Sequence, residues 1–186
     1  MNCNGYLEID FTSYLVLGNT INIRKDIKQY IADGQLDKIP VAIAVNTEKL
    51  STYISQEEYS PEDPISVPNP CFPEDPSKNI LVDSVTLNEL FVTGIIGYAV
   101  GVDILDTSDN VAIKVPAIKL NYITTGGTCE VLTNEPLIIL DNPNESDPSI
   151  KVTVINLEVA EVNRTESEYS FSITGTFRID PIIPIV

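Results

Sequence analysis

The last third of the chain alternates regularly between apolar and polar positions. From residue 169 to residue 180, every second residue is apolar or glycine, and Ser, Thr, Arg and Asp lie between them. A period of two places one set on each face of a β-strand. We therefore predict a half-buried antiparallel strand that forms a hairpin with residues 150–162. Its core face is expected to contain Tyr169, Phe171, Ile173, Gly175, Phe177 and Ile179.

A second long run, residues 90–104, is apolar on both faces. Strands that are covered on both sides have this composition, so we predict a central strand that bends at one of its glycines. Polar residues 106–110 and the pair Gly126–Gly127 predict turns further along the chain. One face of the central strand is expected to contain Leu90, Val92, Ile96, Tyr98, Val100, Val102 and Ile104.

The spacing of apolar residues becomes helical near the N-terminus. Ile23, Ile27, Tyr30 and Ile31 follow the i, i+4, i+7, i+8 pattern of one helix face. Asp33-Gly34 is a typical helix stop. The pattern predicts one short helix near residues 24–33.

Residues 47–78 are set apart by their prolines. The tetrapeptide Pro-Glu-Asp-Pro occurs twice, at residues 61–64 and 73–76. Each proline removes an amide donor, which excludes a central strand or a helix interior. We predict a long surface loop over residues 47–78. Long loops in compact domains are usually functional, so this segment is the first place to look for function.

Together these elements predict a mainly β fold, an antiparallel β-sandwich or jelly roll. Strands that alternate with helices, as a parallel sheet requires, are missing. A length of 186 residues suits a single domain. We expect this domain to carry an N-terminal arm at residues 1–5, the proline-rich loop 47–78 and an apolar C-terminal tail at residues 181–186.

The net charge of the chain limits the kinds of partner that it can bind. It has 27 acidic and 11 basic residues and a formal net charge of −16. Nucleic acids and anionic membranes attract clustered Lys and Arg, and no such cluster is present. No apolar run approaches about 18 residues, so we expect no membrane insertion. The N-terminus has no basic stretch followed by an apolar run, and we expect synthesis in the cytosol without a signal peptide.

The residue types argue against catalysis. The chain has no histidine, which excludes Ser-His-Asp and Cys-His machinery. No glycine-rich phosphate-binding motif is present. Pairs of carboxylates are expected by chance among 27 acidic residues, so they indicate nothing. We predict that the protein is not an enzyme and has no cofactor.

Acidic loops offer an alternative, because Ca²⁺ binds carboxylate and carbonyl oxygens. The candidate ligands are Asp106 and Asp109 in one loop and Asp141 and Asp147 in another. Such a site would suit a Ca²⁺-assisted carbohydrate-binding or adhesion module. The same residue types are common in solvated turns, so both interpretations stay open.

Three cysteines are widely spaced and form no Cys-x-x-Cys pair. Cys129 lies in a predicted strand and is expected to be a small buried residue. Cys3 and Cys71 lie in the N-terminal arm and the proline-rich loop, where thiols are accessible. They are either inert thiols or, in an oxidising final location, partners in an intermolecular disulfide.

The apolar C-terminal tail also has two interpretations. It either folds back on its own domain or adds to a sheet edge of a neighbouring copy, a contact that repeats head to tail into filaments. The assembly contacts predicted from it are Ile182, Ile183, Ile185 and Val186.

One stretch resembles a repeated β motif in structural proteins of the outer layers of Clostridium and Bacillus spores, found in coat, exosporium and appendage components. It spans residues 85–100 and reads Val-Thr-Leu-Asn-Glu-Leu-Phe-Val-Thr-Gly-Ile-Ile-Gly-Tyr-Ala-Val. The resemblance implies a structural subunit of a spore surface, without catalytic residues. Release by lysis of the mother cell would need no signal peptide.

These observations lead to one main hypothesis and two alternatives. The main hypothesis is a non-enzymatic structural subunit that self-assembles into a bacterial surface layer or fibre, associated with spores, with itself as partner. The alternatives are the Ca²⁺-assisted carbohydrate-binding module and a phage or virion structural protein.

Overall fold

The protein is mainly β, as predicted. The computed structural model describes residues 5–18, 20–68, 71, 75–106, 122–133, 135–140 and 149–182. In these residues it contains nine strands, one α-helix and two short 3-10 helices. In chain order they are β1 (Leu7–Gly18), α1 (Lys25–Ala32), η1 (Leu36–Lys38), β2 (Val41–Tyr59), β3 (Ile65–Val67), η2 (Pro76–Lys78), β4 (Ile80–Val82), β5 (Val85–Asp103), β6 (Tyr122–Leu132), β7 (Ile138–Leu140), β8 (Ser149–Arg164) and β9 (Glu168–Ile182).

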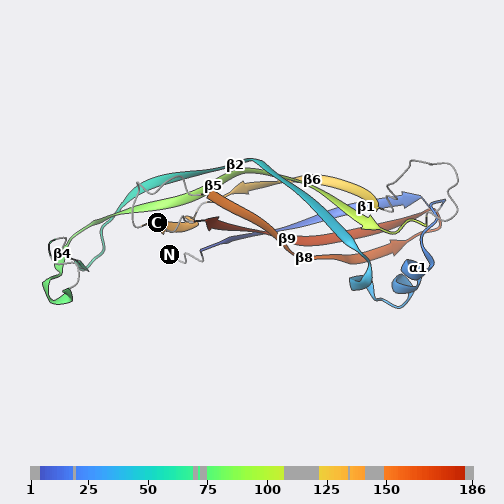
Figure 1. The fold of residues 1–186 in the computed structure, drawn as a ribbon, viewed down its shortest axis with the longest axis horizontal. Coiled ribbons are helices and arrows are strands. Elements are labelled where there is room, and N and C mark those ends of the chain that lie inside the picture. Colours follow the sequence, from blue (N-terminus) through green and yellow to red (C-terminus); the bar gives the residue numbers. More distant parts are fainter. Residues whose placement is uncertain are drawn as a thin grey trace.

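Two antiparallel sheets form the body of an elongated molecule (Figure 1). The first has the order β1-β9-β8 and the second the order β2-β5-β6, with β7 also paired to β5. One buried cluster contains side chains from both sheets, so the sheets face each other across a common core. This arrangement fits the predicted sandwich, and its jelly-roll form stays a prediction.

Aromatic rings join the two sheets at the centre of the core. Phe11 of β1 stacks on Phe177 of β9 with ring centroids 4.4 Å apart. Tyr98 of β5 approaches the same two rings at 4.8 Å and 5.4 Å. Glycine leaves room for them, because a Cβ on Gly175 would lie 2.7 Å from Cζ of Phe11. The predicted core faces of β9 and β5 are therefore the faces that meet.

The predicted central strand and hairpin are both confirmed. β5 pairs with β2 on one edge and with β6 and β7 on the other. β8 and β9 form the C-terminal hairpin, with Ser149 opposite Ile182 and Arg164 opposite Tyr169. Side chains that are fully buried on the predicted faces are Leu90, Val92, Ile96, Val100, Val102 and Ile104 of the β5 region and Phe171, Ile173, Phe177 and Ile179 of β9.

The predicted helix is confirmed as α1. Ile27 is fully buried and Ile23 nearly so, which anchors the helix to the core. The chain then turns at Gly34, whose φ of +69° lies in the left-handed region that suits glycine. The apolar spacing near the N-terminus therefore located the helix correctly.

The predicted loop over residues 47–78 is wrong at its beginning. Residues 47–59 belong to β2, which pairs with β5 as far as Tyr59 opposite Val85. This part contains no proline, so nothing prevents its amides from pairing. The prolines begin at Pro61, and the chain there forms the small hairpin β3–β4 instead of one long loop.

Two other predicted boundaries also change. The tail begins later than residue 181, because Pro181 lies opposite Ile150 and Ile182 opposite Ser149 within β9. Pro181 is tolerated because it lies near the end of β9, where this strand pairs with β8 alone among the described residues. Gly126-Gly127 is not a turn, since β6 runs straight through it alongside Tyr98 and Ala99 of β5.

The bend in the central strand lies at Gly94. The pairing of β2 with β5 shifts between Asn46 and Lys49, and Gly94 opposite this bulge has a φ of +129°. A Cβ at Gly94 would lie 2.1 Å from the carbonyl oxygen of Lys49, which is an impossible contact. Glycine is therefore required here for both conformation and space.

We expect Gly94→Ala to destabilise the protein by more than about 2 kcal/mol, because it combines a strained φ with a backbone clash. Gly97→Ala is the matched control on the same strand, since its Cβ would meet Asn46 at an ordinary 3.7 Å. Urea unfolding of both variants measures the difference. Equal stability of the two variants would show that the bulge does not need glycine.

Candidate functional site

The β2–β5 ribbon continues past the body as a projecting arm. β7 pairs with Asn88–Leu90 of β5, and beyond this point β2 and β5 pair only with each other among the described residues. We call residues 56–87 the arm, and it ends in the β3–β4 hairpin at one end of the molecule (Figure 1). None of its described residues is buried. The arm therefore has no core of its own.

Local hydrogen bonds define the shape of the arm tip. The side chain of Asp75 accepts hydrogen bonds from the backbone N–H and the hydroxyl of Ser77, at 3.1 and 2.6 Å, and caps η2. Asn79 donates to the hydroxyl of Ser66 at 3.2 Å and ties the two sides together. Polar contacts thus hold the described residues of the tip in place.

Apolar side chains are exposed along this arm. Leu81 is 72% exposed, Tyr59 44% and Ile80 43%. A two-stranded ribbon is marginally stable in water when nothing covers it. Exposed aliphatic side chains on such a ribbon are typical of a surface that a partner covers.

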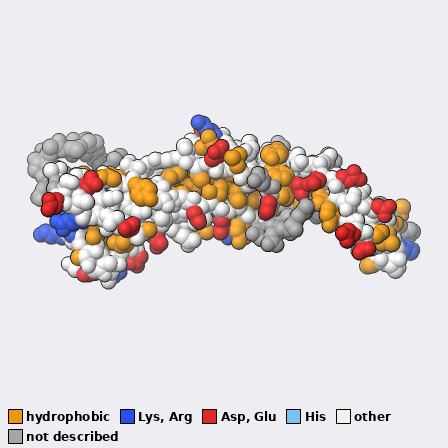
Figure 2. All heavy atoms as spheres, turned by 180° about the vertical axis from the view of Figure 1, so that it is seen from behind, with side chains coloured by type: hydrophobic (Ala, Val, Ile, Leu, Met, Phe, Trp, Pro, Cys, Tyr) orange, Lys and Arg blue, Asp and Glu red, His pale blue; other side chains and the backbone are white. Residues whose placement is uncertain are grey.

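The arm is also strongly acidic. Lys78 is its single basic residue. The described acidic residues are Glu57, Glu58, Glu62, Asp63, Asp75 and Asp83. The space-filling view shows red and orange atoms together at this end (Figure 2). The prediction of a functional segment rested on its prolines and missed its charge, although the acidic residues can be read directly from the sequence.

The structure tests little of the predicted Ca²⁺ sites. Asp106 is described, and its backbone N–H donates to the carbonyl of Asn22 at 2.9 Å. Asp109, Asp141 and Asp147 lie outside the described residues. Within the described ranges, no three His, Cys, Asp or Glu side chains gather closely enough to hold a metal ion. The Ca²⁺ hypothesis therefore stays a prediction.

The tightest ion-pair cluster of the described chain joins α1 to the second sheet. Arg24 contacts Asp26 at 2.5 Å and Asp103 of β5 at 3.0 Å. The hydrogen bond from Arg24 lowers the pKa of Asp26, and these bonds raise the pKa of Arg24 above its usual range. The cluster attaches the helix to the sheet, and we assign it a structural role.

The described start of the first strand and the described end of the last strand lie at the same end of the first sheet. Leu7 at the start of β1 lies opposite Ile179 near the end of β9. That end points toward the arm (Figure 1). Ile182 is 45% exposed. Cys3, Ile183, Ile185 and Val186 lie outside the described residues.

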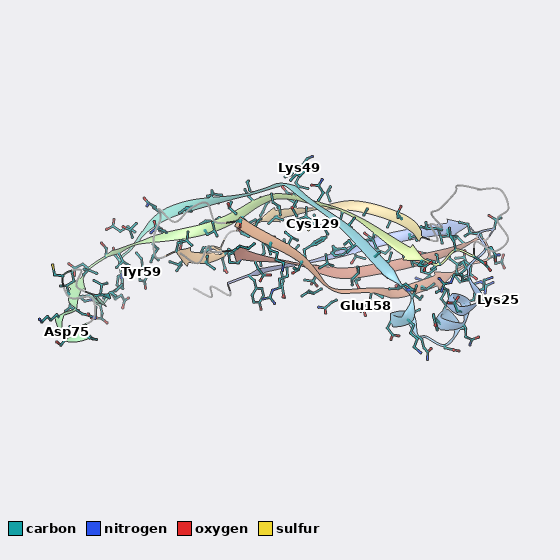
Figure 3. All side chains as sticks on the ribbon, in the orientation of Figure 1. Lys25, Lys49, Tyr59, Asp75, Cys129 and Glu158 are labelled. Carbon is teal, nitrogen blue, oxygen red and sulfur yellow. The ribbon has the colours of Figure 1, made fainter. Side chains whose placement is uncertain are left out.

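The two described cysteines differ in environment. Cys71 lies at the arm tip and is exposed. Cys129 lies on β6 opposite the buried Ile96 and is half-buried, less than predicted, and this partial burial raises the pKa of its thiol. Of the predicted disulfide pair, Cys71 is thus accessible and Cys3 stays untested. Figure 3 shows Cys129 in the body and Asp75 at the distant arm tip.

No helix in the described part of the chain has the length and apolar character needed to cross a membrane.

We expect Cys71 to react with a maleimide roughly tenfold faster than Cys129, because the reactive thiolate is scarcer where burial raises the pKa. The measurement uses a Cys3→Ser background and mass spectrometry of labelled peptides over time. In denaturant the two rates should converge. Equal rates in the folded protein would contradict the burial of Cys129.

Comparison with known proteins gave no match at three levels: no family model, no curated protein and no solved structure is similar to this chain.

Proposed function

We propose that this protein is a non-enzymatic structural subunit that assembles with copies of itself into a fibre or layer on a bacterial surface, associated with spores. The observation that carries the proposal is the arm, an ordered β-ribbon without a core that projects from a well-packed body. Ordering such a segment costs conformational entropy that burial normally offsets. A neighbouring copy would supply that burial.

The sheet edges support the same proposal. β8 carries register shifts between Ile155 and Glu158 and between Val159 and Glu161, and bulges of this kind discourage unwanted edge pairing. β1 pairs with β9 through 12 consecutive residues without a shift, so its backbone is regular. A regular edge strand is suited to accepting an added strand from a neighbour, such as the apolar C-terminal tail.

The spore association rests on the resemblance of residues 85–100, which form most of β5. It fits a chain expected to be released by lysis, and the accessible Cys71 at the arm tip would suit covalent linkage after release into an oxidising environment.

We expect the full-length protein to form filaments or sheets at high concentration, visible by negative-stain electron microscopy and light scattering. Reductant or the double variant Cys3→Ser/Cys71→Ser should weaken these assemblies without abolishing them, because the non-covalent contacts remain. A protein that stays monomeric under both oxidising and reducing conditions would overturn the proposal.

An armless variant tests whether the arm serves assembly or folding. Replacing residues 58–86 with Asn-Gly would connect Glu57 to its partner Leu87 by a two-residue hairpin turn. Because none of the described residues of the arm is buried, we expect Tm to change by no more than about 3 °C, which corresponds to about 1 kcal/mol.

The same variant should lose assembly in light scattering. A large fall in Tm would assign the arm a role in folding. Unchanged assembly would place the contacts between copies elsewhere.

A further inference from the structure

A small pocket lies at the end of the molecule opposite the arm. It has a volume of about 260 Å³ and is lined by three residues of α1 and by the two residues that flank the β8–β9 turn. These residues are Lys28, Ile31, Ala32, Arg164 and Tyr169. Figure 1 shows α1 and β4 at opposite ends of the longest axis.

The turn between β8 and β9 holds one side of this pocket in place. Thr165 donates its backbone N–H to the carbonyl of Glu168 at 2.9 Å, and its hydroxyl accepts the N–H of Glu168 at 3.1 Å. Arg164 and Tyr169 are thereby fixed opposite each other, with the guanidinium 5.2 Å from the centre of the tyrosine ring. All five lining residues of the pocket come from a single folded chain.

The lining combines positive charge with apolar surface. Lys28 and Arg164 have no ion pair with any other described residue, whereas nearby Arg24 is bound by Asp26 and Asp103. Ile31, Ala32 and Tyr169 supply the apolar part. A pocket of this chemistry fits an aliphatic side chain flanked by carboxylates.

Positive charge is scarce in the chain and concentrates at this end. Of 11 basic residues, five lie in α1, around it or at the β8–β9 turn, namely Arg24, Lys25, Lys28, Lys38 and Arg164. Seven described acidic residues accompany them, namely Asp26, Asp33, Asp37, Asp103, Asp106, Glu166 and Glu168, so these residues sum to −2, which is closer to neutral than the arm. The arm has six described acidic residues and one lysine. The arm is therefore clearly more negative than the end that carries α1.

The arm tip has the complementary chemistry. Leu81 is the most exposed large apolar side chain of the described residues. Asp83 lies two residues further along the chain, and Glu58, which accepts a hydrogen bond from Ser84 at 2.7 Å, lies on β2 opposite Thr86. An exposed leucine on an acidic arm is the ligand that the pocket fits.

We propose that the arm tip of one copy docks into this pocket of the next, with Leu81 against Ile31 and Tyr169 and the carboxylates near Lys28 and Arg164. This inference rests on the proposed function and identifies its joint. The two surfaces lie on opposite ends of one chain, so the contact is heterologous and does not close on itself. It would repeat into an open-ended fibre in which all copies point the same way.

Two variants remove one half of the joint each. Lys28→Glu/Arg164→Glu reverses the charge of the pocket and leaves the arm intact, and Leu81→Asp removes the apolar part of the arm tip and leaves the pocket intact. All three side chains are exposed, so the fold should persist, and circular dichroism checks this. The matched controls are Lys25→Glu beside the pocket and Leu132→Asp, whose side chain is 71% exposed on the body.

We expect each joint variant to raise the protein concentration required for assembly by at least about tenfold. Both controls should assemble like the natural chain. Mixing the two joint variants gives the decisive result. The pocket variant supplies an intact arm and the arm variant an intact pocket, so one copy of each should form a dimer that cannot grow further. Sedimentation velocity measures both outcomes.

The outcomes separate this joint from the proposed function. If the natural chain assembles and the joint variants assemble equally well, docking of the arm tip into the pocket is overturned, the joint lies elsewhere, and the structural function stands. If the natural chain never assembles, both proposals are overturned. Joint variants that lose assembly but do not form a dimer when mixed would also overturn the joint.

An engineered disulfide provides a second readout that does not depend on weakening the contact. In a Cys3→Ser/Cys71→Ser background, Ala32→Cys combined with Leu81→Cys should give a ladder of cross-linked copies on oxidation. Ala32→Cys combined with Leu132→Cys is the control and should remain monomeric on a denaturing gel. A ladder in the control alone or in neither would contradict docking of the arm tip into the pocket.

Discussion

The contact of Phe11, Tyr98 and Phe177 between the two sheets is the interaction on which the rest of the structure depends. Three rings in mutual contact bury a large apolar area and set the separation of the sheets. Glycines opposite them, Gly127 and Gly175, leave the space that any larger residue would fill. The hydroxyl of Tyr98 accepts a hydrogen bond from Ser13 at 3.2 Å, which satisfies the polar end of this half-buried ring.

The position of this core determines where the molecule is left uncovered. β9 is buried along most of its length, but β5 loses its cover beyond Asn88, where the first sheet no longer faces it and β7 ends. The β2–β5 ribbon continues past this point as a pair of strands, and none of the described residues of the arm is buried. A single strand pair thus belongs to the body at one end and to the arm at the other. The body anchors the arm at its base, and burial beyond that point has to come from a partner.

The distribution of charge then determines which contacts between copies are favourable. A net charge of −16 keeps copies apart in general, and two acidic arm tips repel each other. The end that carries α1 is closer to neutral than the arm and exposes Lys28 and Arg164, so approach of an arm to this end meets less repulsion than approach to another arm. Ion pairs at an exposed surface stabilise little by themselves, about 0–1 kcal/mol each. Their effect is mainly on orientation, and burial of apolar side chains supplies the affinity.

The sequence by itself determined the features that local periodicity encodes. The alternation at residues 169–180 identified β9 and its buried face, the apolar run at 90–104 identified the central strand, and the spacing of Ile23 and Ile27 located α1. Each of these follows from how side chains project from one element, which neighbouring residues alone decide.

The tertiary structure decided the rest. The polar residues 47–59 are a strand because β5 pairs with them, and Gly126-Gly127 stays extended because it lies beside Tyr98. The pocket joins α1 to a turn more than a hundred residues later in the chain. Such features depend on partners distant in sequence, and the pattern of one segment contains no information about the segment that will lie next to it.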